Sequence, residues 1–214
     1  MLDPTGAAFW SKKRVLIVAD PHFEKQQGLA FRTRLAAQDT KALIERLNRL
    51  VRLYRPSRVI VLGQSPQESL RLAKDDRARI EAMAREAQFI WVADNHEAAA
   101  HALPGQCVAL HREGPFTFRH QASAQLAPRE IEISGHFSPK ASIDARGRRV
   151  SRPCFVADAQ RLMLPAFGSI TGNMDVREPS IFRLFPRGLR VFLLGQDQLF
   201  SFALEQLGRM AEVA

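Results

Sequence analysis

Three short runs in the first half of the chain are apolar almost throughout, with no alternation between hydrophobic and polar positions. They are residues 14–19, 58–62 and 89–93. Uninterrupted apolar runs of this length are typical of strands that are covered on both faces of a sheet. We therefore expect these three runs to lie side by side in the interior of one sheet.

The two stretches between these runs carry apolar residues at helical spacing. Residues 39–54 place one apolar face inward, made of Leu43, Leu47, Leu50, Val51 and Tyr54. A second helix is predicted over residues 66–88, with Leu70, Ala73, Ile80, Met83 and Ala84 inward. Strands that alternate with helices in this way are typical of a parallel sheet with helices packed on its faces.

The second half of the chain changes to short alternating segments, separated by Gly, Pro, Asp or Gln. These segments are residues 116–119, 130–133, 153–157, 161–164, 181–185, 190–194 and 199–202. Their pattern predicts a mainly antiparallel sheet. Together the two halves predict an α/β sandwich in which two mixed sheets pack together with helices outside, as a single domain over residues 1–214.

Composition narrows the class of protein. The 214 residues are 46% hydrophobic and 25% charged, as in ordinary soluble globular proteins. No apolar run approaches the roughly 20 residues that a membrane-spanning helix needs, and the first residues lack the features of a secretory signal. Cys107 and Cys154 have no CxxC spacing and are expected to be reduced thiols. These features predict a cytoplasmic protein with no membrane association.

The charge balance favours a polyanionic partner. The chain has 31 Lys and Arg residues against 22 Asp and Glu residues, a net charge of +9, which makes nucleic acid the first candidate. The residues that we expect to contact nucleic-acid phosphates lie around a predicted hairpin tip at Gly147, namely Arg146, Arg148 and Arg149. A second basic face is formed by Arg46, Arg49 and Arg52. A solvated charged surface is the alternative interpretation for both clusters.

Polar side chains follow each of the apolar runs. In open α/β sheets, ligands bind beyond the carboxyl ends of the strands, so these positions are the candidates for a functional site. They include Asp20, His22, Gln64, Asn95, His96, Glu97, His120 and His136. Carboxylate and imidazole groups together are ligands for Mn, Fe or Zn. The sequence therefore predicts a divalent-metal site at one edge of the sheets.

The order of these residues resembles the motif series D-x-H, G-D, G-N-H-[D/E], H, G-H-x-H of the calcineurin-like metallophosphoesterases. Over roughly residues 15–202 the chain is also similar to one branch of that family, the bacterial ligase-associated DNA damage response endonucleases. The stretches that carry this similarity are residues 18–25, 91–97, 133–136, 152–156 and 164–172. The resemblance implies a sandwich fold, hydrolysis of nucleic-acid or nucleotide phosphodiesters, and a role in DNA repair with a DNA ligase and a helicase as partners.

The resemblance also implies a role for each site residue. Asp20 and His22 match the ligands of a first metal ion, and Asn95, His120 and His136 match those of a second, with Gln64 at the bridging position. His96 matches the residue that contacts the phosphate and protonates the leaving oxygen, and Glu97 the one that orients its imidazole. Mn is the implied metal, with Fe or Zn as alternatives. His111 competes with His120 for its position.

Two departures from the family pattern leave two hypotheses open. Gln64 stands where the family has an aspartate that bridges both metals, and Ser138 stands where it has a metal-binding histidine. A neutral amide at the bridge does not offset the repulsion between two dications. The protein is therefore either a phosphoesterase that uses one ion or a rearranged pair, or a catalytically impaired pseudoenzyme that serves as a binding or assembly module, with one ion or none.

Overall fold

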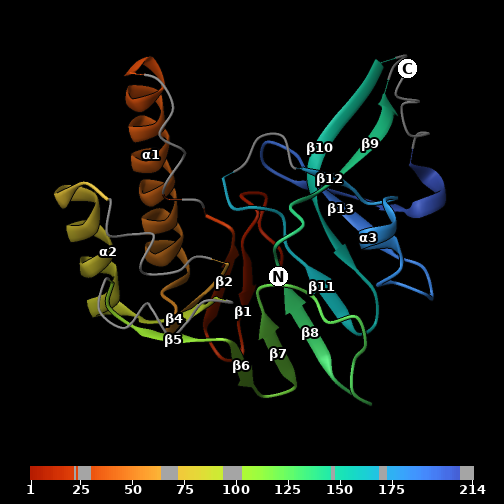
Figure 1. Cartoon of the computed structure of the whole chain (residues 1–214), viewed down its shortest axis with the longest axis horizontal. Coiled ribbons are helices and arrows are strands. Elements are labelled where there is room, and N and C mark those ends of the chain that lie inside the picture. The colour runs from red at the N-terminus through yellow and green to blue at the C-terminus, as the bar shows by residue number, and fades with distance from the viewer. Residues whose placement is uncertain are drawn as a thin grey trace.

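A five-stranded sheet contains the three apolar runs of the N-terminal half (Figure 1). Its strand order is β1 (Ala8–Trp10), β2 (Val15–Ala19), β3 (Arg58–Leu62), β4 (Gln88–Val92) and β5 (Gln106–Val108). The structure is a computed structural model, and it describes residues 1–21, 23, 30–63, 72–93, 103–145, 148–168 and 173–207. Strands β2 to β5 run parallel, and β1 is antiparallel to β2. The predicted parallel arrangement of the three runs is confirmed.

Successive residues of these strands enter two different hydrophobic cores. In β2, Leu16 and Val18 belong to a core shared with the helices, whereas Ile17 and Ala19 belong to a core shared with a second sheet. All five residues of β2 are buried. Because both faces of the sheet are covered, the strands need apolar residues at every position, which explains their unbroken hydrophobic pattern.

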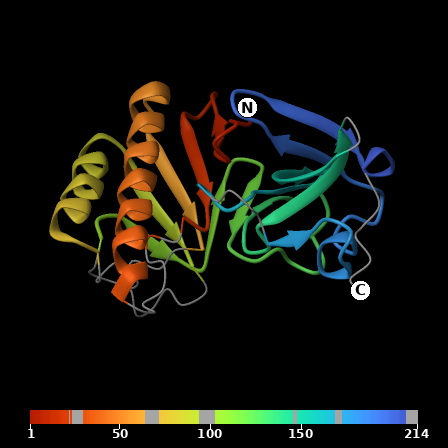
Figure 2. The same ribbon diagram turned by 90° about the horizontal axis from the view of Figure 1, so that it is seen from above.

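Two helices cover one face of this sheet. They are α1 (Ala30–Tyr54) and α2 (Lys74–Glu86), and Figures 1 and 2 show both on the side away from the second sheet. In α1, Leu47, Leu50 and Val51 are buried against the sheet as predicted, and in α2 so are Ile80 and Met83. None of the described helices combines the length and the apolar character that a membrane crossing requires.

The second sheet has nine strands and mixed directions. They are β6 (Leu110–Glu113), β7 (Phe116–Arg119), β8 (Ile131–Ser134), β9 (Pro139–Ala145), β10 (Arg148–Ala157), β11 (Arg161–Met163), β12 (Met174–Asp175), β13 (Arg190–Leu194) and β14 (Leu199–Ala203). Strand β10 pairs antiparallel with β9, β11 and β13. Strand β8 pairs in parallel with both β7 and β11.

The two sheets pack face to face. Ile60 and Ile90 of the first sheet share a buried core with Phe118, Ile133 and Phe155 of the second. The far side of the second sheet is covered by the short helix α3 (Pro179–Phe182) and the 3₁₀ turn η3 (Leu204–Gln206). Figure 2 shows this order of helix layer, first sheet and second sheet. The predicted α/β sandwich of two mixed sheets flanked by helices is confirmed.

Both predicted helices have different bounds in the structure. The first begins earlier than residue 39, at Ala30. The second begins only at Lys74, and residues 64–71 lie outside the described part of the chain. The prediction that Ala73 points inward is wrong, because Ala73 is exposed and is the N-cap residue of α2.

The predicted strand at residues 181–185 is also wrong. This segment forms the end of α3 and a turn, with Pro179 in the first helical turn. Ile181 and Phe185 are both buried, four residues apart, whereas Phe182 is 43% exposed. Spacing of four residues places side chains on one face of a helix, and over such a short segment it is not distinguishable from strand alternation.

Candidate functional site

The backbone brings several strand ends to one edge of the sandwich. Beyond the last pairs of β2, β3 and β4, the ladder continues through three hydrogen bonds, from Asp20 N to Leu62 O (2.8 Å), from Gly63 N to Val92 O (2.8 Å) and from Ala93 N to Val108 O (3.0 Å). The residues that follow each strand are therefore held in register beside one another. This is the edge that the sequence predicts for a site.

Three of the predicted site residues meet at this edge. Oδ1 of Asp20 lies 3.0 Å from Nε2 of His120, and Oδ2 accepts a hydrogen bond of 2.7 Å from the backbone N–H of His136. The rings of His120 and His136 are 4.9 Å apart and almost perpendicular. Asp20 is only 4% exposed. One buried carboxylate from the first sheet thus contacts two histidines from the second.

Two glycines allow this close approach. A Cβ at Gly63 would lie 2.3 Å from Oδ1 of Asp20 and 2.5 Å from the His120 ring, and a Cβ at Gly135 would lie 2.8 Å from Oδ2. Gly63 also has a positive φ of 88°. No other residue type fits either position without moving the carboxylate or the imidazole.

The backbone at this site has an unusual conformation. Among the described residues, six other than glycine have a positive φ, and three of these are Asp20 (43°), His136 (71°) and Ser138 (45°). Such conformations cost free energy and concentrate where a structure holds functional groups in place. Three of the six thus lie at this one edge, an observation that is independent of the sequence motifs and directs attention to the same residues.

The segment after β11 joins the two sheets beside the site. Leu164 donates its N–H to Ser134 O (2.8 Å), and Phe167 donates its N–H to Ala19 O (2.7 Å). Ser134 immediately precedes the Gly135–His136 turn, and Ala19 immediately precedes Asp20. The relative position of the carboxylate and the histidines is thus fixed by main-chain hydrogen bonds.

Of the two positions that depart from the family pattern in the sequence analysis, Ser138 is the one that the structure describes. Its side chain is 1% exposed, and its hydroxyl has no hydrogen-bond partner among the described residues. Its carbonyl accepts a hydrogen bond from Asn173 N–H (2.7 Å). A buried hydroxyl without a partner costs about 1–3 kcal/mol, so this position is one where the fold bears an energetic cost.

Most of the remaining predicted site residues cannot be placed. Six lie outside the described residues, namely His22, Gln64, Asn95, His96, Glu97 and Arg146. Of the two histidines that compete for one position, His120 contacts Asp20, whereas His111 lies 3.5 Å from Glu113 and packs against Phe118.

The donor chemistry at this edge is compatible with a divalent metal. Asp20, His120 and His136 provide a carboxylate and two imidazoles, which Mn, Fe and Zn all accept as ligands. Both Asp20 oxygens already accept protein hydrogen bonds, but each retains a second lone pair. Within the described ranges, however, no group of three His, Cys, Asp or Glu side chains is placed to hold a metal ion. The metal therefore stays a prediction.

The two described basic candidates lie on a hairpin that begins at the site. Strand β9 starts at Pro139, directly after Ser138, and its antiparallel register with β10 pairs Ala145 with Arg148. Arg148 and Arg149 are exposed. Seven residues of strand span about 23 Å, so both arginines lie well beyond the site edge. They belong to the long β9–β10 ribbon seen in Figure 1.

One buried charge cluster was missed by the sequence analysis. Glu132 is fully buried, and its carboxylate contacts Arg161 Nη1 (2.5 Å), Arg119 Nε (3.0 Å) and Ser123 N–H (2.9 Å). Arg119 also pairs with Glu130. The only signal in the sequence was a glutamate in the middle of an apolar strand, which does not reveal its partners.

The fold and the edge at which these polar groups gather define an α/β sandwich of the nuclease and phosphoesterase type. Among solved structures, the chain is similar to the crystal structure of Pseudomonas putida nuclease MPE, with a TM-score of 0.67 and 25% sequence identity. The similarity covers 94% of this chain and 93% of that one. No protein-family model matches the chain, and no curated protein sequence matches it.

Proposed function

We propose that this protein is a metal-dependent phosphoesterase of the calcineurin-like type that hydrolyses nucleic-acid phosphodiesters. The observation that carries the proposal is the contact of one buried carboxylate, Asp20, with His120 and His136 at the shared edge of two sheets. The structural similarity to a nuclease over nearly the whole length of both chains supports it. A role in DNA repair beside a DNA ligase and a helicase follows from the family resemblance alone.

The described residues have defined tasks in this reaction. Nε2 of His120 lies 3.0 Å from Oδ1 of Asp20, so the imidazole and the carboxylate are placed to act on the same group. The backbone N–H of His136 anchors the second carboxylate oxygen. When bound, a divalent metal supplies Lewis-acid polarisation of the phosphoryl group and an acidified water. His96, oriented by Glu97, is proposed to protonate the leaving oxygen.

The β9–β10 hairpin is the proposed nucleic-acid interface. Arg148 and Arg149 are exposed on a ribbon that starts at the site, and Arg146 lies between them and β9 in the sequence. A strand whose scissile phosphate reaches Asp20 has further phosphates within range of these arginines. Contacts of this kind bind the backbone without reading the base sequence.

A second candidate function is a pseudoenzyme that binds nucleic acid or a partner without hydrolysis. The observation that favours it is Ser138, a buried neutral hydroxyl without a described partner at a position where the family supplies an imidazole. Gln64 is likewise neutral. Both changes weaken metal binding, so the two candidates differ in metal content and turnover.

Metal content and phosphodiester hydrolysis together test the proposal. We expect the purified protein to bind Mn and to hydrolyse bis(p-nitrophenyl) phosphate and single-stranded DNA, with loss of activity in chelator. His120→Ala should lower turnover by about 100-fold or more, because it removes a group in contact with the reacting centre. His111→Ala is the matched control and should retain turnover, since His111 lies away from Asp20. A protein with neither bound metal nor turnover would disprove the enzymatic proposal.

The double variant Gln64→Asp with Ser138→His tests the meaning of the two departures. It restores an anionic bridge and an imidazole, and we expect turnover to rise by at least about tenfold with Mn because two metals would then be held together. Bound metal per chain, measured in parallel, should rise as well. Unchanged metal content and turnover would show that these positions do not limit metal binding.

A further inference from the structure

A second concave site lies at the opposite edge of the second sheet. Three loops enclose a pocket of about 440 Å³. They are residues 124–128 between β7 and β8, residues 158–160 between β10 and β11 with Arg161 at the start of β11, and residues 183–187 after α3. We call it the arginine pocket, because Arg161, Arg183 and Arg187 line it together with Leu126, Leu184 and Pro186.

The arginine pocket has an excess of positive charge. Among the described lining residues Asp158 alone is acidic, and its Oδ1 already accepts the backbone N–H groups of Gln160 and Arg161, each at 2.8 Å. Arg161 is neutralised by the buried Glu132. Arg183 and Arg187 are exposed, and neither makes an ion pair with a described residue. Two guanidinium groups are therefore available to an anionic ligand.

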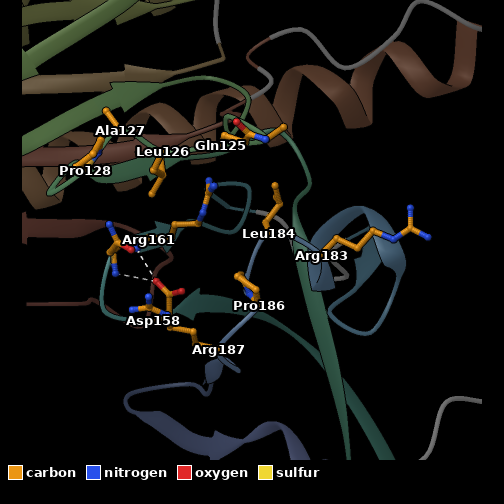
Figure 3. A pocket seen from close by; sticks show the side chains of 12 residues that line it. Gln125, Leu126, Ala127, Pro128, Asp158, Arg161, Arg183, Leu184, Pro186 and Arg187 are labelled. Atoms are coloured by element: carbon orange, nitrogen blue, oxygen red, sulfur yellow. Dashed lines mark hydrogen bonds between the residues drawn. The ribbon is translucent and has the colours of Figure 1, made fainter.

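The remaining lining of the pocket is mixed, with the amides of Gln125 and Gln160 beside several aliphatic side chains. Leu126, Leu184 and Pro186 lie around its mouth, and Figure 3 shows Arg183 extending outward from the rim. None of the described lining residues is aromatic. Proteins that bind single-stranded nucleic acid combine basic groups with aromatic platforms on which bases stack. Aliphatic side chains beside guanidinium groups suit instead a peptide that carries carboxylates and apolar side chains.

The position of the pocket separates it from the proposed catalytic edge. Strands β8 and β11 are parallel, with Arg161 opposite Glu132, so the pocket lies where both strands begin. His136 follows the other end of β8. Four residues of strand place the two sites about 13 Å apart along the sheet. A ligand in the arginine pocket therefore does not occupy the Asp20 site.

A second basic pocket provides a contrast. It measures about 470 Å³ and is lined by Arg14, Arg52 and Arg55 together with Glu86. The guanidinium of Arg14 donates to the carbonyl of Arg55, just past the C-terminus of α1. The carbonyl end of a helix repels anions, and Glu86 adds a carboxylate. Arg14 is thus engaged within the protein, and the helix end and Glu86 make the second pocket less favourable to an anion than the arginine pocket.

We propose that the arginine pocket binds an acidic, leucine-containing segment of a partner protein. Carboxylates of the segment pair with Arg183 and Arg187, and its apolar side chains contact Leu126 and Leu184. This interaction is distinct from the proposed hydrolysis and does not depend on it.

Fluorescence anisotropy with a labelled peptide of Glu, Asp and Leu tests the proposal on the intact chain. We expect the peptide to bind, and the matched peptide with Gln and Asn in place of Glu and Asp to bind at least about tenfold more weakly. Arg183→Glu with Arg187→Glu should weaken binding of the acidic peptide at least about tenfold. Arg52→Glu with Arg55→Glu makes the same change in net charge at the second basic pocket and should leave the affinity within about twofold.

Three outcomes would overturn the proposal. One is a failure of the acidic peptide to bind, and another is an equal loss of affinity in both double variants, which would indicate net charge alone. The third is that single-stranded DNA, and not the acidic peptide, loses affinity in Arg183→Glu with Arg187→Glu. That result would assign the pocket to nucleic acid. Circular dichroism of both variants verifies that they fold, as expected for exposed side chains.

Discussion

At the scale of single residues, the candidate site depends on close packing around the carboxylate of Asp20. The carboxylate of Asp20 is buried and held by one side-chain and one backbone contact. Gly63 lies against both Asp20 and His120. The position of the Asp20 carboxylate therefore depends on Gly63, a neighbour without a side chain.

Gly63→Ala tests this control. The added Cβ would clash with Asp20 Oδ1 and His120, and a misplacement of about 1 Å costs roughly 100-fold in catalysis. The positive φ should also cost about 1–2 kcal/mol of stability. We expect both losses, measured by phosphodiester hydrolysis and by urea unfolding.

Gly188→Ala is the matched control for this change. Gly188 has a similar φ of 91°, but a Cβ there meets nothing within 4 Å. The control should therefore lose a similar amount of stability and keep its activity. Equal loss of activity in both variants would indicate general destabilisation, and not a disturbed site.

At the scale of elements, strands β7, β8 and β11 are joined by a buried ionic cluster. Burial raises the pKa of Glu132 above the ordinary value of 4.5, against the opposing effects of the Ser123 hydrogen bond and of Arg161 and Arg119. The hydrogen bond from Ala127 N–H, more than the pairing with Arg119, lowers the pKa of Glu130. Two glutamates that share one arginine thus have pKa values displaced in opposite directions.

The two glutamates should therefore give opposite pH dependences of stability. A raised folded pKa means that the contribution of Glu132 is complete below the unfolded pKa and declines as pH rises through the folded pKa. The lowered pKa of Glu130 means that its contribution is present above the unfolded pKa and is lost as pH falls through the folded one.

Glu132→Gln and Glu130→Gln separate these effects. We expect the stability of Glu132→Gln relative to the original protein to rise with pH, and that of Glu130→Gln to fall with pH. Urea unfolding between about pH 3 and pH 8 spans both windows. Parallel pH profiles in the two variants would contradict the assignment.

At the scale of the whole molecule, the net charge of +9 should make binding to nucleic acid depend on salt. We expect the double variant Arg148→Ala with Arg149→Ala to bind DNA more weakly. The slope of log affinity against log salt concentration should become shallower by about one for each phosphate contact that is lost. Filter binding over a range of salt concentrations measures both quantities.

Arg183→Ala with Arg187→Ala removes the same charge from the arginine pocket. If the β9–β10 hairpin is the interface, this control should keep nearly the full salt slope. A larger effect in the control than in the hairpin variant would move the nucleic-acid interface to the other edge of the second sheet.

The strands with a strong local pattern were predictable in detail. Residues 58–62, 116–119 and 190–194 are strands with the expected bounds. Strand β9 has no such pattern, because its sequence alternates small, charged and apolar residues, and its conformation depends on six paired residues of β10. Residues 181–185 were mistaken for a strand because five residues do not separate a period of two from one of 3.6.

The sequence by itself determined that Asp20, His120 and His136 follow strands, and parallel strands carry the residues after them to a common edge. It did not determine that His120 and not His111 reaches Asp20, because chain order does not specify which strands become neighbours across two sheets. The arginine pocket was likewise decided only by tertiary structure, since its three loops follow different elements and meet where the strands β8 and β11 begin. Secondary structure follows largely from side chains that are close in the sequence, whereas contact between distant segments follows from packing of the whole chain.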